Sequence, residues 1–87
     1  MHDDRVPCIT SMFRLQWEQA QECHVLLYPE GMVKLSASAG EILKRVDGQK
    51  SVAAILDDLK TVFPEADLDD DVLKFLEQAR DNGWINV

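Results

Sequence analysis

The sequence predicts a small α+β domain in which a three-stranded antiparallel sheet is followed by a bundle of three helices. Apolar residues recur at every second position in the first part of the chain, which is typical of strands, and at helical spacing after about residue 38. The chain has 87 residues, so mean domain sizes leave room for one core. We therefore expect a single domain over residues 12–87, preceded by a flexible N-terminal arm over residues 1–11.

Three segments of the first part are predicted to form the sheet. From Met12 to Glu18 apolar and polar residues alternate, which indicates a half-buried strand. Residues 23–28 are rich in β-forming residues, and the Pro29-Glu30-Gly31 sequence after them favours a tight turn. The returning strand, residues 32–35, completes a meander. Helices follow this strand directly, so we expect one of its edges to stay unpaired.

Three amphipathic helices are predicted to cover the sheet. Ser38 and Glu41 have the spacing of a capping box, which predicts the start of the first helix. Ser51 is expected to cap the second helix and Pro64 to close it. The third helix is predicted to begin within Asp67–Asp71, whose carboxylates are expected to cap free backbone N–H groups and suit the positive end of the helix dipole.

The charge balance excludes several classes of partner. Nine basic and sixteen acidic residues give a net charge of -7, and residues 51–87 hold three basic against nine acidic residues. An acidic C-terminal half argues against nucleic acid and against anionic membrane surfaces, because both are bound through lysine and arginine. No apolar run approaches the roughly 18 residues of a membrane helix, and the acidic N-terminus does not resemble a secretion signal. We therefore expect a cytoplasmic protein.

The side chains that could carry chemistry are few. The sequence holds no recognisable catalytic or phosphate-binding motif, so we expect no enzymatic activity and no cofactor. Cys8 and Cys23 could join His2 and His24 in a zinc site, but their spacing fits no recurring zinc module. The run Asp69–Asp71 lacks the alternating ligands of a calcium-binding loop. We expect reduced thiols and no bound metal.

An interaction surface is the remaining way for this chain to act. A free strand edge can accept an extended peptide through main-chain hydrogen bonds, the mode called β-augmentation. In the third helix the predicted core stripe consists of Val72, Phe75, Leu76 and Ala79. One further apolar residue, Leu73, lies at the flank of this stripe and close to Asp69, Glu77 and Arg80. A groove between the strand and the helix would use Leu73, although a wider core stripe would explain the residue equally well.

Several motifs closely resemble those of the PqqD family, the peptide chaperones of pyrroloquinoline quinone (PQQ) biosynthesis. The most specific is the run His24-Val25-Leu26-Leu27-Tyr28-Pro29-Glu30-Gly31. Gly40, where a better helix former is expected, departs from the helical pattern. The resemblance covers about residues 13–85 and extends over further segments, namely Arg14–Trp17, Ser36–Leu43, Val46–Ile55 and Phe75–Trp84.

The resemblance implies a winged-helix-like arrangement and a non-catalytic function. Members of this family bind the leader of the ribosomal precursor peptide PqqA and present it to the radical SAM enzyme PqqE. The leader pairs with the third strand and lies against the third helix, with Lys34 and Arg80 available for acidic leader residues. Carried over by position, the peptide-binding residues are Met32, Val33, Lys34, Leu35 and Ser36 on the strand, and Asp69, Leu73, Leu76, Glu77 and Arg80 on the helix.

Other functions compete with this interpretation. A winged-helix nucleic-acid-binding domain has a compatible element order, but its recognition helix would begin with Asp69–Asp71, which repel phosphate. An acidic carrier protein would need a modified serine in an Asp-Ser-Leu setting, whereas Ser36 lies between Leu35 and Ala37. Another protein-interaction module stays open. An unpaired strand edge can also join a second copy, so a weak or domain-swapped homodimer is a further hypothesis.

Overall fold

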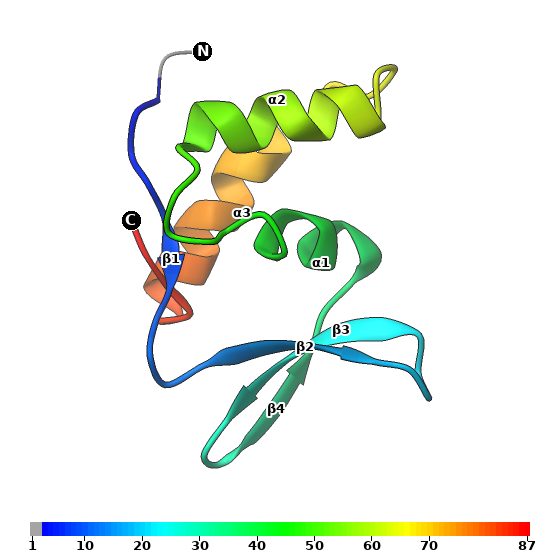
Figure 1. The fold of residues 1–87 in the computed structure, drawn as a ribbon, viewed down its shortest axis with the longest axis vertical. Helices are drawn as coiled ribbons and strands as arrows, with labels where there is room; N and C mark the ends of the chain where they lie inside the picture. Colours follow the sequence, from blue (N-terminus) through cyan, green and yellow to red (C-terminus); the bar gives the residue numbers. More distant parts are fainter. Residues whose placement is uncertain (1–2) are drawn as a thin grey trace.

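The computed structural model describes residues 3–87, and it places the sheet and the helices at opposite ends of an elongated molecule of 36 × 25 × 19 Å (Figure 1). Strands β2 (Arg14–Glu18), β3 (Cys23–Tyr28) and β4 (Gly31–Lys34) form an antiparallel sheet in the order β2-β3-β4. The register pairs Leu15 with Leu26 and Leu26 with Val33. The predicted meander is confirmed.

The other end of the molecule consists of three helices, α1 (Ala37–Leu43), α2 (Val52–Val62) and α3 (Asp69–Asp81). Helix α1 follows β4 after a short connection and packs on β3 and α2, so it joins the two ends (Figure 1). The core includes Leu26 of the sheet, but most of its fully buried side chains come from the helices. These elements confirm the predicted α+β fold class.

The start of α1 differs from the sequence prediction. Ser36, not Ser38, is the N-cap: its backbone is extended, and its side-chain oxygen accepts a hydrogen bond of 3.2 Å from the N–H of Ala39. Ser38 lies inside the helix, where its own backbone is already helical and leaves no capping geometry. Glu41 accepts a hydrogen bond from Arg45 at 2.9 Å instead of reaching back to the cap.

The other two helices start where the sequence predicts, but only one of the two predicted caps is confirmed. Ser51 caps α2 by accepting from the N–H of Ala54 at 3.1 Å. At α3 the N-cap is Leu68, which makes no side-chain hydrogen bond, so the predicted capping by Asp67–Asp71 is wrong. Asp69, Asp70 and Asp71 occupy the first turn, where their charge still favours the positive end of the helix dipole.

A second, two-stranded sheet lies at the helical end. Strand β1 (Cys8–Ile9) pairs with β5 (Ile85–Asn86), close to α3. Ahead of β1, the carbonyl of Arg5 accepts from the N–H of Val52 at the start of α2, at 2.8 Å. The part of the predicted N-terminal arm that the structure describes therefore lies along the helices, and its flexibility stays a prediction.

Gly40 allows α1 to approach the sheet. A Cβ added at this position would lie 2.7 Å from Nδ1 of His24 on β3, which is closer than two such atoms can approach. The imidazole of His24 in turn packs against Trp17 on β2, with ring centroids 5.0 Å apart in an edge-on arrangement. This close contact between α1 and β3 explains why a glycine, a weak helix former, stands at position 40.

Candidate functional site

The outer edge of β4 presents unpaired backbone groups. The N–H of Leu35 donates to the carbonyl of His24 at 3.0 Å, which fixes the phase of hydrogen bonding between β3 and β4. Antiparallel pairs alternate between bonded and non-bonded positions, so Val33, opposite Leu26, is also turned toward β3. The backbone groups of Met32 and Lys34 therefore point away from the sheet. Among the described residues, β4 pairs only with β3.

The side chains of β4 alternate in the same way. Met32 and Lys34 are exposed, whereas Val33 is half-buried and packs against the core. The two residues that turn their backbone groups outward thus carry side chains on the solvent side of the sheet. A peptide added to this edge would meet a clear run of hydrogen-bonding groups.

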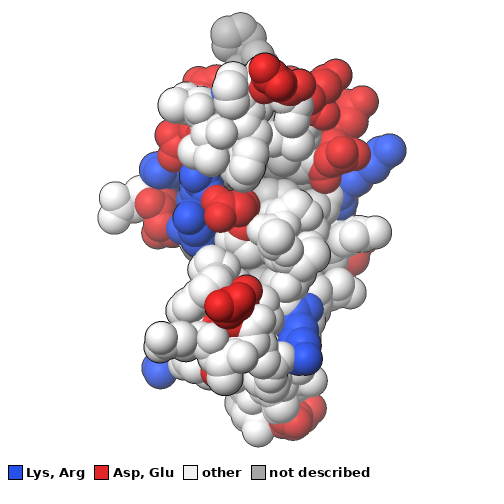
Figure 2. All heavy atoms as spheres, turned by 90° about the vertical axis from the view of Figure 1, so that its right-hand side faces the viewer, with Lys and Arg blue, Asp and Glu red and all other residues white. Residues whose placement is uncertain are grey.

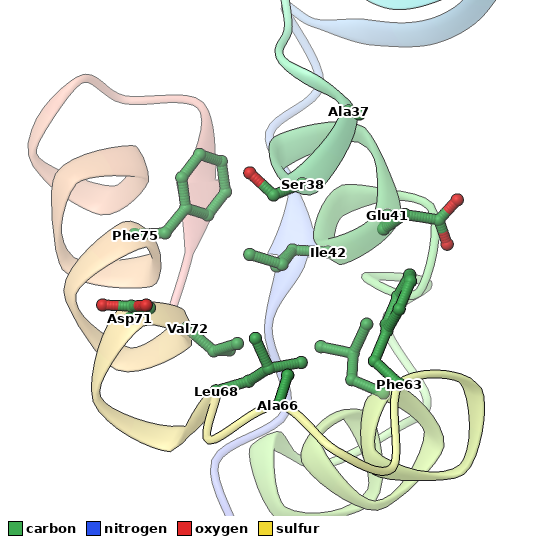
Figure 3. A pocket seen from close by; sticks show the side chains of 11 residues that line it. Ala37, Ser38, Glu41, Ile42, Phe63, Ala66, Leu68, Asp71, Val72 and Phe75 are labelled. Carbon is green, nitrogen blue, oxygen red and sulfur yellow. The ribbon is translucent and has the colours of Figure 1, made fainter.

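An apolar groove of about 580 Å³ opens between the three helices (Figure 3). Ser38 and Ile42 line it from α1, and Val72 and Phe75 from α3, while Phe63 and Ala66 close its far end. Ile42 and Val72 point into the hollow from opposite sides (Figure 3). Ala37 also lines the groove, and it follows the last residue of β4 by three positions in the chain.

The two walls of the groove differ in charge. On the α1 side, Glu41 is neutralised: Arg45 Nη1 lies 2.9 Å and Lys44 Nζ 3.4 Å from its carboxylate. The hydrogen bond from Arg45 is the main reason that the pKa of Glu41 is held below its usual value. On the α3 side, Asp71 makes no ion pair within residues 3–87. Figure 2 shows acidic side chains gathered over the helical end on the side of the molecule that faces right in Figure 1.

The structure brings the predicted strand residues together but buries part of the predicted set. Met32, Lys34 and Ser36 are exposed along one run. Leu35 points into the core, and Leu76 of α3 is only 2 % exposed because it packs there as well. The side chains of these two leucines stabilise the fold and are not accessible to a peptide at the surface.

The other predicted helix residues lie on the flank of α3 away from the groove. Asp69 pairs with Lys60 of α2 at 3.3 Å. The pKa of Arg5 in the N-terminal segment is raised mainly by its hydrogen bond with Asp3, and the charge of Glu77 adds to this shift. Residues at spacings of three and four share one helix face, so Leu73 and Arg80 belong to this flank too. These four residues do not line the groove between α1 and α3.

The residues of α3 that face the groove were not assigned to the site by sequence reasoning. Asp71 was assigned to capping, and Val72 and Phe75 to the inward core stripe. Phe75 is only half-buried, and it lies on the opposite side of the core stripe from Leu73. The sequence does offer a signal, because one apolar residue lies on each flank of the stripe, Leu73 on one side and Phe75 on the other. Helical periodicity alone does not tell which of the two flanks faces the groove.

No metal-binding arrangement is found within residues 3–87. Cys8 and Cys23 are free, and no group of three or more His, Cys, Asp or Glu side chains in this range is placed to hold an ion. His2, the remaining residue of the hypothetical zinc set, lies outside the described residues. Across the same range, no helix combines the length and the apolar character needed to cross a membrane.

Comparisons with known proteins agree on one family. Residues 23–85 match the family described as coenzyme PQQ synthesis protein D (PqqD). A PqqA binding protein of Azotobacter vinelandii is 57% identical over 83 residues, covering 94% of this chain and 90% of the relative. A PqqA binding protein of Pseudomonas paraeruginosa is 58% identical over 85 residues, covering 97% and 92%.

A solved structure shares the fold. It is the solution NMR structure of the PqqD truncation of Methylobacterium extorquens PqqCD, described as a functional and stand-alone recognition element for ribosomally synthesized and post-translationally modified peptides. The TM-score is 0.77 at 27% identity, and the match covers 94% of this chain and 89% of the other. Sequence and fold therefore lead to the same family.

Proposed function

The chain belongs to the PqqD family, and we propose that it is a peptide chaperone that binds the precursor PqqA by strand addition to the outer edge of β4. Relatives more than half identical to this chain are PqqA binding proteins. The structural neighbour is a recognition element for peptides of this class. A precursor-peptide chaperone is the function that these relatives support.

The orientation of the β4 backbone carries the proposal. The N–H and carbonyl groups of Met32 and Lys34 point outward, because those of Leu35 and Val33 are turned toward β3. An incoming strand would pair with these outward groups, which gives affinity that tolerates sequence differences. Pockets beside the edge would then select the side chains of the leader.

The chaperone itself catalyses nothing in this proposal. It would hold the leader and present the remainder of PqqA to the radical SAM enzyme PqqE, which modifies the core peptide. The two cysteines are free thiols, as is usual for cytoplasmic proteins, and we place the reaction in that compartment. The same free edge could pair with a second copy in the absence of peptide, so the proposed weak or swapped dimer would compete with PqqA.

The site that we propose follows from this geometry. Met32, Lys34 and Ser36 would contact the peptide with backbone and exposed side-chain groups, while the backbone of Val33 and Leu35 would keep β4 in register with β3. On α3, the proposed wall moves from the Leu73 flank to the groove-facing flank.

Proline substitution at the outward position tests strand addition. Lys34→Pro removes an N–H that makes no ladder bond in the free protein, and proline is tolerated on strand edges. Binding of synthetic PqqA, measured by isothermal titration calorimetry, is expected to weaken at least about tenfold, since a peptide carbonyl would lose its donor. The matched control, Lys34→Ala, removes the same side chain and keeps the N–H.

The outcome separates backbone from side-chain recognition. Strand addition predicts near-normal PqqA affinity for Lys34→Ala and the loss for Lys34→Pro only. Equal affinity of the two variants, with both folded by circular dichroism, would count against pairing at β4.

A further inference from the structure

We propose that the outer edge of β2 is an interaction surface for a second copy of this chain, in which two β2 strands pair antiparallel about a two-fold axis at Gln16. The pairing joins two three-stranded sheets into one sheet of six strands. It leaves the β4 edge of each copy free, so it does not compete with the proposed peptide site. Only this last point rests on the proposed function.

The edge of β2 presents unpaired backbone groups at alternate residues. The carbonyl of His24 accepts a hydrogen bond at the β4 side, so the backbone of its neighbour Val25 is turned toward β2. Gln16 is the partner of Val25 in the register and therefore faces β3, whereas the N–H and C=O groups of Leu15 and Trp17 point outward. Among the described residues, β2 pairs only with β3.

The sequence of β2 complements itself in this phase. The strand reads Arg14-Leu15-Gln16-Trp17-Glu18. An antiparallel copy centred on Gln16 places Leu15 opposite Trp17 of the second copy, and these are the residues whose backbone groups point outward to form the hydrogen bonds. Arg14 then lies opposite Glu18 of the second copy. The two-fold axis repeats both contacts, so two apolar pairs and two pairs of opposite charge form in one interface.

The side chains of β2 are open to these contacts. Trp17 lies on the same side of the sheet as His24 and yet is 52 % exposed, so the helices leave this part of the sheet uncovered. Arg14 is exposed, and neither it nor Glu18 makes an ion pair within residues 3–87. Glu18 accepts a hydrogen bond from the N–H of Ala20 at 3.3 Å. A second copy would bury part of the indole and supply both charges with partners.

The edge of β4 does not match itself in the same way. A copy paired about Val33 would place Met32 opposite Lys34 of the second copy, which forms no pair of opposite charge. We therefore assign self-pairing to β2 and peptide pairing to β4. The strand order of the dimer is β4-β3-β2-β2-β3-β4, with one free β4 edge for a peptide at each end.

A cysteine at the two-fold axis tests the register. Directly opposite Cα atoms of a non-bonded antiparallel pair are about 4.5 Å apart, a separation that a disulfide can bridge. In a chain whose Cys8 and Cys23 are replaced by serine, we compare Gln16→Cys with Arg14→Cys under mild oxidation. Position 14 is also exposed on this strand, but it lies about 13 Å from its own copy. Gln16→Cys should give at least about tenfold more covalent dimer than Arg14→Cys.

A charge exchange tests the same register without introduced cysteines. Arg14→Glu places two carboxylates opposite each other at two places in the dimer, and Glu18→Arg does the same with two cations. Each single variant should raise the dimer Kd at least about fivefold in sedimentation equilibrium. The double variant restores opposite charges and should return to within about twofold of the unmodified protein. Protein concentrations up to about 1 mM are needed, because a short strand pair buries little surface and supports only a weak dimer.

The outcomes separate this interface from the proposed function. Selective cross-linking through Gln16→Cys and rescue by the double charge variant support pairing through β2. A monomer at about 1 mM, or a dimer that shows neither effect, overturns it. The cross-linked dimer should bind two chains of synthetic PqqA in calorimetry, and loss of binding in this dimer alone would overturn the free β4 edges. If the monomer also binds no PqqA, the proposed function is overturned while the β2 interface stands.

Discussion

The two ends of the molecule are stabilised in different ways. At the helical end, buried leucine, isoleucine and valine side chains from α1, α2 and α3 pack together, and β1 and β5 tie the two terminal segments to α3. At the sheet end, β2 and β4 are both edge strands, and large apolar side chains such as Trp17 and Met32 stay about half exposed. The helical end thus holds most of the hydrophobic core, whereas the sheet end presents the unpaired backbone groups of two edge strands.

This difference indicates where function resides. A site for an extended peptide needs unpaired backbone groups, which a fully packed end does not offer. The same groups need a rigid support, which the contact of α1 with β3 provides. The proposed binding surface accordingly lies at the outer edge of β4, the strand that leads into α1.

The largest effect is expected in the helical core. Leu43 of α1 is fully buried, so Leu43→Ala removes its apolar contacts and leaves a cavity. We expect the free energy of unfolding to fall by about 2–5 kcal/mol, measured by chemical denaturation. If the free energy of unfolding falls by less than about 1 kcal/mol, the helical end is not the main source of stability, and the contrast between the two ends is wrong.

The junction should give an intermediate effect. Gly40→Ala forces a Cβ against the imidazole of His24, and overpacking of this kind costs about 1–3 kcal/mol. His24→Ala removes the imidazole, the nearest part of the obstacle, and leaves only its Cβ at 3.1 Å, so the double variant should lose less stability than the sum of the two single variants. Strict additivity in this cycle would contradict the contact as the reason for the glycine.

A smaller effect is expected at the sheet end. Trp17 is 52 % exposed, and its edge-on contact with His24 is its main aromatic interaction. Trp17→Ala should therefore lower the free energy of unfolding by only about 0.5–1.5 kcal/mol in the same denaturation experiment. A loss as large as that of Leu43→Ala would show that the sheet end is stabilised as strongly as the helical core.

The smallest effect concerns the compensated wall of the groove. Arg45→Gln removes the hydrogen bond that holds the pKa of Glu41 down, so that pKa should rise toward its ordinary value in a carboxyl NMR titration. A folded-state pKa below the unfolded one stabilises the protein above the unfolded value, and this stabilisation is lost as the pH falls through the folded pKa. Arg45→Gln should weaken that dependence at acidic pH. An unchanged pKa of Glu41 would contradict the assigned cause.

The sequence was sufficient to predict the elements whose signals are local. The strand β2, the turn after Tyr28 and the cap at Ser51 each have a signal within a few residues, and the structure confirms all three. The burial predicted from the alternation in β2 fails at Trp17, which is exposed. The start of α1 was predicted two residues late, because Ser36 and Ser38 are both good caps and only the backbone conformation distinguishes them.

The features that depend on distant contacts could not be predicted. Strands β1 and β5 are two residues long and come from opposite ends of the chain, so neither has a periodic pattern. The same limit applied to α3. Its apolar stripe predicted that Val72 faces the core, but which flank faces the groove depends on how α3 packs against α1 and α2, which are separate elements.

Amide hydrogen exchange with and without PqqA tests strand addition most directly. In the free protein the N–H groups of Met32 and Lys34 should exchange rapidly, while those of Val33 and Leu35 are protected by β3. Saturating PqqA should slow exchange at Met32 and Lys34 at least about tenfold, with little change at the other two. Unchanged exchange at Met32 and Lys34 in a PqqA-saturated sample would contradict pairing at the β4 edge.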